Sequence, residues 1–156
     1  MQAFVWLYWS KASVVNLQQT HEVFQLTKHY HFYAAHRNEQ MKGKCANIHG
    51  HTYYVRVGLR LTRENDNEVT MLFSDIDQQL EPIFEPFDHA FLLDKNDSKA
   101  EAIRELAGKV KEFDYPTSAE NLARYFYKEV DARMGGLVDY VEVQETTSSV
   151  VRYCGP

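Results

Sequence analysis

One short stretch of the sequence, KCANIHGH at residues 44–51, carries a cysteine and two histidines within eight positions. Cys45 supplies a thiol, and a single glycine separates His49 from His51. Successive side chains of a strand point to opposite faces, so in an extended segment the two imidazoles would share one face. A catalytic zinc site has three protein ligands and one open position. The stretch therefore predicts two ligands of a metal site and requires a third from a neighbouring strand.

Three histidines in the segment 22–36 are candidates for the third ligand: His29, His31 and His36. The segment is rich in aromatic and β-branched residues, which predicts a long strand. Strand parity places His36 on one face and the other two on the opposite face. Two alanines precede His36 and leave its imidazole room to reach a metal, which favours His36 with the two histidines of KCANIHGH. Two alternatives stay open: His29 and His31 form the metal pair, or none of these histidines binds a metal.

The thiol of Cys45 has two interpretations. Lys42 and Lys44 flank it, and nearby positive charge favours the reactive thiolate over the thiol, whose reference pKa is about 8.5. A lone cysteine is, however, more often a small buried hydrophobic residue. The lysines favour a reactive group.

Two carboxylates also lie where they can take part in chemistry. Asp88 is adjacent to His89 in FDHAF, and such a pair forms either a proton shuttle or a simple turn at the end of a helix. Glu145 shares strand parity with Val141 and Val143, so a carboxylate lies at the end of an apolar face. Burial there costs free energy unless the carboxylate has a partner, and a ligand with adjacent N–H donors would be a bidentate one. The alternative is a residue at a strand end that turns toward solvent.

The elements that must position these residues follow from periodicity and turn signals. Residues 51–62 alternate in hydrophobicity, as a half-buried strand does, and pair plausibly with the strand at 22–36. The remaining elements are a helix at 75–87 that contains Pro82, a short helix at 97–110, a helix at 116–136 with a capping box at Thr117 and Glu120, and two strands after residue 136. This order predicts an α+β domain.

Length and charge limit the function further. The 156 residues suit one domain, 1–156, and the net charge of −5 excludes the basic surface that nucleic-acid binding requires. Two cysteines are too few for a disulfide framework and suit the reducing cytoplasm. The apolar run Phe4–Trp9 falls short of the roughly 20 residues of a membrane helix, and no basic residue precedes it as in a signal peptide. We expect residues 1–20 to form an arm or an extra strand, with no membrane partner.

Six landmarks together resemble one enzyme family: FYAAHR, KCANIHGH, FSDIDQQL, FDHAFLLD, PTSAENLA and VEVQETTSSVVRY. They are similar, in that order, to those of the 6-pyruvoyl-tetrahydropterin and 6-carboxytetrahydropterin synthases, from about residue 22 to residue 153. The resemblance implies an α+β tunnelling fold (T-fold). In that fold an antiparallel four-stranded sheet carries two main helices on one face. Trimers close into a barrel, usually doubled to a hexamer.

The same resemblance implies a role for each candidate residue. It implies Zn²⁺ on His36, His49 and His51. It implies Cys45 as the general base, Asp88 and His89 as its proton-relay partners, and Glu145 as the anchor of the pterin ring. Sites of this family lie between subunits, so Cys45 and the metal would face a histidine or glutamate of another chain. The implied substrate is the small molecule dihydroneopterin triphosphate.

The spacing between Cys45 and His49, with three residues between them, decides the expected product. It resembles the bacterial 6-carboxytetrahydropterin synthases of queuosine (7-deazapurine) biosynthesis, which release triphosphate and acetaldehyde, whereas pyruvoyl synthases tend to have a longer gap. A pyruvoyl synthase is one alternative, and a non-catalytic pterin- or metal-binding module is another. The first twenty residues and the link at 94–114 depart from the family pattern, and their roles are left open.

Overall fold

The computed structural model describes residues 22–63 and 69–156, so the expected arm at residues 1–20 lies outside the described residues. The strands form one sheet in the order β4-β3-β1-β2-β5-β6. They are β1 (Glu22–His36), β2 (His49–Arg63), β3 (Ala90–Asp94), β4 (Val110–Phe113), β5 (Val138–Thr146) and β6 (Ser149–Tyr153). The helices are α1 (Phe73–Phe84), α2 (Ala100–Leu106) and α3 (Ala119–Met134), with short 3₁₀ turns η1 (Gly43–Ala46) and η2 (Glu85–Phe87).

The two long strands β1 and β2 form an antiparallel pair that runs from Glu22 opposite Arg63 to His36 opposite His49. Each strand has 15 residues. The expected strand at 51–62 therefore begins two residues earlier, at His49, because that residue pairs with the end of β1. This extension places both histidines of KCANIHGH within regular strand, where side chains at i and i+2 share a face.

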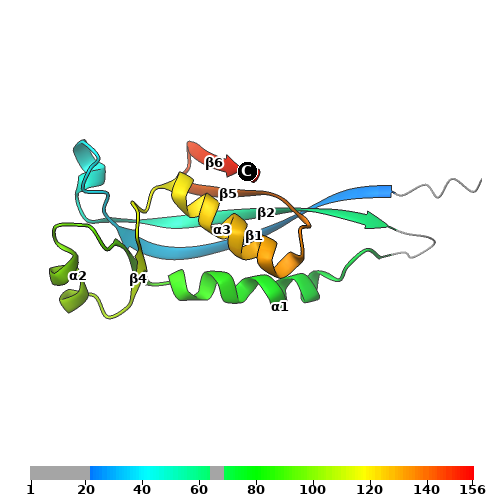
Figure 1. Ribbon diagram of the computed structural model, residues 1–156, viewed down its shortest axis with the longest axis horizontal. Helices are drawn as coiled ribbons and strands as arrows, with labels where there is room; N and C mark the ends of the chain where they lie inside the picture. Colours follow the sequence, from blue (N-terminus) through cyan, green and yellow to red (C-terminus); the bar gives the residue numbers. More distant parts are fainter. Residues whose placement is uncertain (1–21, 64–68) are drawn as a thin grey trace, which may run out of the picture.

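The expected α+β class and the four-stranded antiparallel sheet are confirmed: β1, β2, β5 and β6 pair antiparallel. Two short strands that the sequence analysis did not predict extend this sheet, since β3 pairs parallel with β1 and β4 pairs parallel with β3. Parallel neighbours need a crossover connection, and α2 lies in the connection between β3 and β4. Figure 1 shows α2 and β4 together at one end of the molecule.

The core lies between the sheet and the two longer helices, α1 and α3, which cover the same face (Figure 1). Phe32 of β1 stacks on Tyr53 of β2 with ring centroids 4.9 Å apart, and Phe126 of α3 meets Phe32 edge-on at 5.8 Å. The opposite face of β1 is exposed, including His29, His31 and Tyr33. Strand parity thus separates a helix-covered face from an open one.

The helices differ from the expected ones mainly at their ends. Helix α1 begins at Phe73, two residues before the predicted start, and ends at Phe84, with Pro82 tolerated in its last turn. Helix α2 (Ala100–Leu106) is shorter than the predicted helix at 97–110. The last residue of that prediction, Val110, instead begins strand β4. Among the described residues, no helix is long and apolar enough to cross a membrane.

The predicted capping box of α3 is wrong. Ser118, not Thr117, is the N-cap, and its side chain accepts a hydrogen bond from the backbone N–H of Asn121. Thr117 is fully buried and contacts His36 instead. The predicted stop is correct, because Gly135 ends the helix in the left-handed conformation at φ 61°.

Replacing the observed cap should destabilise the protein. Ser118→Ala removes the side-chain acceptor of an otherwise unpaired N–H, so we expect the free energy of unfolding to fall by about 1 kcal/mol. Urea unfolding at one fixed protein concentration measures the change. The matched control is Ser149→Ala at the exposed start of β6, where the change should stay within about 0.5 kcal/mol. Equal effects of the two substitutions would contradict the assignment of Ser118 as the cap.

Candidate active site

Three histidines converge at one end of the β1–β2 pair. His36 is the last residue of β1 and pairs with His49, the first residue of β2, while His51 pairs with Ala34. One ligand atom of each histidine lies within 4.8 Å of the others, and the Nε2 atoms of His36 and His49 are 3.1 Å apart. Among the described residues this is the single group of three or more potential ligands that comes together. The strand register is therefore sufficient to assemble the cluster.

Backbone carbonyl groups set the tautomers of two of these histidines. His36 Nδ1 lies 3.0 Å from the Thr117 carbonyl oxygen, and His49 Nδ1 lies 2.8 Å from the Asn47 carbonyl oxygen. A carbonyl oxygen only accepts, so each Nδ1 carries the proton and donates it, which leaves each Nε2 with a lone pair. Two lone pairs that face each other at 3.1 Å repel unless a shared cation binds both. The donor set therefore fits a metal ion.

Burial favours the neutral form of two of these histidines, and the neutral form is the one that binds a metal. Burial, followed by the neighbouring His49, lowers the pKa of His36 to about 4. Burial also lowers the pKa of the His51 imidazole, again with a contribution from His49. Neutral imidazoles with free nitrogens are zinc ligands. The alternative pair, His29 and His31, lies on the exposed face and does not enter the cluster.

Glu145 lies beside the three histidines with an unsatisfied carboxyl oxygen. Its Oε1 is buried and makes no hydrogen bond with any described residue. Burial raises the pKa of this carboxyl. The Tyr53 hydroxyl approaches it without completing hydrogen-bond geometry, and the Tyr53 ring packs 5.5 Å from the His51 ring. A buried acceptor without a partner costs free energy, so this carboxyl is prepared for a ligand that brings N–H donors.

Cys45 is exposed in η1, the short turn between β1 and β2. The alternative of a small buried hydrophobic residue is therefore wrong. Its sulfur is not part of the metal-ligand group. Its backbone carbonyl accepts a hydrogen bond of 2.9 Å from the backbone N–H of Asn38, two residues after His36. The thiol is thus accessible, on a turn that begins and ends near metal-ligand candidates.

Asp88 and His89 form a hydrogen-bonded pair between η2 and β3. Asp88 Oδ2 lies 2.7 Å from His89 Nδ1, while Asp88 Oδ1 accepts a 3.0 Å hydrogen bond from the backbone N–H of Tyr33. The Tyr33 N–H, followed by His89, holds the pKa of the Asp88 carboxyl below its usual range. His89 adopts a left-handed φ of 56°, which only a few per cent of non-glycine residues adopt.

The Asp88–His89 pair is not part of the group of three potential metal ligands. The His89 side chain is 75% exposed and packs against Tyr33, which lies on the open face of β1, opposite His36. Tyr33, His89 and Lys109 line a hollow of about 580 Å³, and His51 is also part of its lining. One subunit therefore presents the metal-ligand group and the Asp88–His89 pair on two different faces of the sheet.

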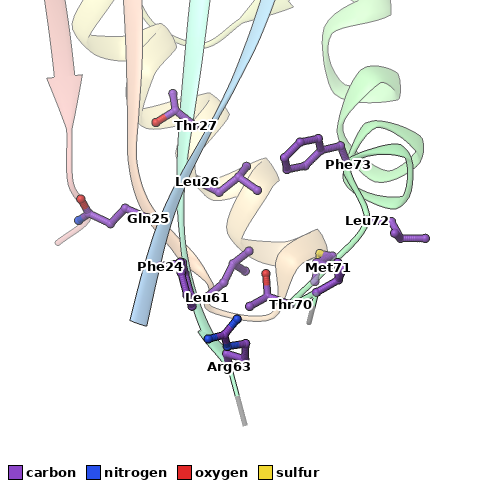
Figure 2. Close-up of a pocket in the computed structure, with 11 residues that line it drawn as sticks. Phe24, Gln25, Leu26, Thr27, Leu61, Arg63, Thr70, Met71, Leu72 and Phe73 are labelled. Atoms are coloured by element: carbon purple, nitrogen blue, oxygen red, sulfur yellow. The ribbon is translucent and has the colours of Figure 1, made fainter. Parts of the chain in front are cut away.

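A second hollow, of about 620 Å³, lies at the far end of the β1–β2 pair (Figure 2). It is lined by residues 24–27, Leu61, Arg63 and residues 69–73. The lining is mainly apolar and includes no histidine, cysteine or carboxylate. It lacks the chemistry of a catalytic centre, which leaves the histidine end of the sheet as the candidate site.

Sequence reasoning missed three residues around this site: Asn47, Tyr53 and Thr117. Thr117 and Asn47 act through backbone carbonyl oxygens, which any residue type supplies. Tyr53 has the parity of His49 and His51, and this signal would have placed its hydroxyl on the same face.

Comparison with known proteins places the chain in a family. Residues 25–156 match the family model described as 6-pyruvoyl tetrahydropterin synthase. The 6-carboxy-5,6,7,8-tetrahydropterin synthase of Haemophilus influenzae is 30% identical, with 84% of this chain and 99% of that protein covered. The enzyme of the same name from Synechocystis sp. is 32% identical over 83% of this chain and 92% of its own length.

Solved structures agree on the fold. The 6-pyruvoyl tetrahydropterin synthase of Caenorhabditis elegans superposes with a TM-score of 0.64 at 21% identity, over 86% of this chain and 97% of that one. An uncharacterized protein from Wolinella succinogenes superposes with a TM-score of 0.73 at 20% identity, over 86% and 99%. At such identities the likeness concerns the fold, and it confirms the expected T-fold. From its residues 25–156 and these relatives, the chain belongs to the 6-pyruvoyl tetrahydropterin synthase family of pterin synthases.

Proposed function

We propose that this protein is a zinc-dependent lyase of the 6-carboxytetrahydropterin synthase type. It converts dihydroneopterin triphosphate and one water molecule to 6-carboxytetrahydropterin, triphosphate and acetaldehyde, as a step of queuosine biosynthesis in the cytoplasm. One observation carries the proposal: the unpaired Glu145 carboxyl oxygen lies beside three histidines whose ligand atoms lie within 4.8 Å of one another. A metal site next to a buried acceptor suits a substrate that has hydroxyl groups and an N–H edge.

Each candidate residue has a chemical role in this proposal. His36, His49 and His51 hold Zn²⁺, which supplies Lewis acidity to oxygens of the substrate side chain. Glu145 accepts two hydrogen bonds from the 2-amino-pyrimidinone edge of the pterin and so orients the ring. The exposed Cys45 thiolate takes a proton from the substrate carbon as general base.

The Asp88–His89 pair moves protons between the substrate and solvent. Asp88 holds Nδ1 of His89 at 2.7 Å, so the proton of that nitrogen is fixed and Nε2 is the atom that exchanges. Asp88 is itself fixed by the Tyr33 N–H. The same arrangement of a carboxylate that orients an imidazole is widely used for proton transfer.

The site is completed between subunits of a homo-oligomer, a trimer or a hexamer. This part of the proposal is supported by the position of the Asp88–His89 pair, which is exposed on the face opposite the three histidines. A second copy can bring its pair to Cys45 and the metal ligands of the first. Isolated subunits would then lack a proton relay.

The carboxy product is favoured over the pyruvoyl product for two reasons. Three residues separate Cys45 from His49, and relatives at 27–32% identity carry the carboxy name. A 28% identical relative from Dictyostelium discoideum is named 6-pyruvoyl tetrahydrobiopterin synthase, so that reaction is the second candidate. The exposed Cys45 argues against a non-catalytic binding module, because binding alone needs no base.

The product decides between these functions. Incubation with dihydroneopterin triphosphate should yield 6-carboxytetrahydropterin, acetaldehyde and triphosphate, identified by mass and by aldehyde assay. Cys45→Ala should lower turnover by roughly 10²-fold or more while the metal stays bound, because a general base contributes on that scale. Cys154→Ala at the other exposed cysteine is the control and should turn over normally. A pyruvoyl product would support the second candidate, and no turnover by wild type would support the binding module.

Metal content tests the three histidines. The purified protein should carry about one zinc per chain, and His49→Ala or His51→Ala should lose most of it, because two imidazoles leave the ion incompletely coordinated. Elemental analysis after dialysis measures the content. His31→Ala on the exposed face is the matched control and should retain the metal. Retention in both ligand variants would remove these histidines from the site.

Glu145→Gln should weaken pterin binding with little effect on stability. The amide presents one acceptor and one donor to an edge that offers two donors. Each charge-assisted hydrogen bond is worth about 1.5–3 kcal/mol, so affinity should fall at least about tenfold. Calorimetric titration of sepiapterin into the assembled protein measures this, with Glu105→Gln on exposed α2 as control. Equal affinities would place Glu145 outside the pterin site.

A further inference from the structure

The segment that leaves β1 is held to the beginning of the α2 link by a buried ion pair. Arg37 directly follows the last residue of β1, and its Nε lies 2.9 Å from Asp97 Oδ2. The side chains are 9% and 2% exposed, so both charges have left water. The Nε contact does not have hydrogen-bond geometry, which makes it a charge contact. Arg37 also pairs with Glu39, at 3.2 Å between Nη2 and Oε1. Removing Arg37 would therefore leave the Asp97 carboxylate buried without its cation, which is strongly unfavourable.

A second contact repeats this attachment two residues later. Glu39 Oε2 accepts a 2.7 Å hydrogen bond from the backbone N–H of Ser98, and Glu39 Oε1 accepts one from the Ser98 hydroxyl. Asp97 in turn accepts a 2.8 Å hydrogen bond from the backbone N–H of Lys99 through Oδ1. This hydrogen bond fixes the backbone at the start of the link, next to the residues that contact Arg37 and Glu39. Two side chains of one segment, at positions 37 and 39, thus bind two successive residues of another, at positions 97 and 98.

Between these two anchors lies Asn38, which contacts the turn that carries the thiol. Asn38 is buried, and its backbone N–H donates to the Cys45 carbonyl oxygen at 2.9 Å. Its own carbonyl oxygen accepts a 2.9 Å hydrogen bond from the Met41 N–H. The backbone of Cys45 is therefore tied to the segment that Arg37 and Glu39 fix in place.

We propose that Arg37 and Asp97 are positioning residues that hold the Cys45 turn at a set place relative to the metal ligands. This inference rests on the proposed function for the role of Cys45, and it assigns a purpose to the link at 94–114. The link begins at the end of β3, and Asp97 meets Arg37 immediately after the metal-ligand candidate His36. Movement of a reacting group by about 1 Å can cost on the order of 10²-fold in rate.

The alkylation rate of Cys45, relative to that of the other exposed cysteine, reports the placement of the Cys45 turn without any substrate. Iodoacetamide reacts with Cys45 and Cys154 in the same assembled molecules, and mass spectrometry of the digested protein gives the ratio of their rates. Cys154 lies after β6, outside the contacts described above, and serves as the internal reference. We expect Asp97→Asn to change the ratio by about threefold or more, because the accessibility and electrostatic surroundings of a thiol set its reactivity.

Turnover provides the second measurement. Asp97→Asn should lower kcat about tenfold or more, with KM within about twofold and the zinc content unchanged, as expected when an interaction of the chemical step is lost. The control is Asp114→Asn in the same link, whose ion pair with Lys95 is 80% exposed on the aspartate side. The control should leave both the alkylation ratio and kcat unchanged.

A double substitution separates positioning from stability. Arg37→Met with Asp97→Leu removes both charges of the pair, so neither remains buried without its partner and stability should recover. We expect the altered alkylation ratio and the low kcat to persist in this variant. The double variant also tests the positioning role if the Asp97→Asn variant does not fold. A wild-type alkylation ratio in whichever of these variants folds overturns the proposal, whatever the value of kcat. A changed ratio in a protein whose wild type shows no turnover refutes the proposed reaction and leaves the positioning standing.

Discussion

The register of the β1–β2 pair is the constraint on which the candidate site depends. It places His36 opposite His49 and Ala34 opposite His51, so that three imidazoles meet at one end of two long strands. Because the side-chain period of a strand is two, a slip of one residue would move His36 to the open face and Phe32 out of the core. The same pairing thus serves packing and chemistry. The apolar contact of Phe32 with Tyr53 and Phe126 holds the register that the histidines need.

Around the histidines, some polar groups have hydrogen-bond partners within the protein and others have none. The Nδ1 atoms of His36 and His49 are occupied by backbone carbonyl oxygens, while their Nε2 atoms face each other. Glu145 Oε1 has no partner among the described residues although it is buried. Most buried polar groups in folded proteins are hydrogen-bonded, so unpaired groups gathered at one place identify a binding site. Burial adds to this, since it lowers the pKa of the His36 and His51 imidazoles and raises the pKa of the Glu145 carboxyl.

The two faces of the sheet divide the proposed chemistry. Metal ligands and the pterin anchor belong to the helix-covered face, whereas the Asp88–His89 pair is exposed beside Tyr33 on the open face. Because these groups lie on opposite faces of one sheet, the proposed function places them in a site shared between copies. The link at 94–114 adds a third component, because its first residues hold the segment between His36 and the Cys45 turn.

The sequence alone determined most of the strand pattern and the candidate residues. Alternation and parity placed β1 to the residue, set His36 apart from His29 and His31, and put Glu145 on an apolar face, because a period of two depends only on local geometry. The ends of elements and the contacts between distant segments were decided by the tertiary structure. Thr117 is not the helix cap that the sequence predicts, because it contacts His36, 81 positions away. The short strands β3 and β4 form by pairing with β1 and with each other. Such contacts depend on which surfaces meet after folding, and no local pattern encodes that choice.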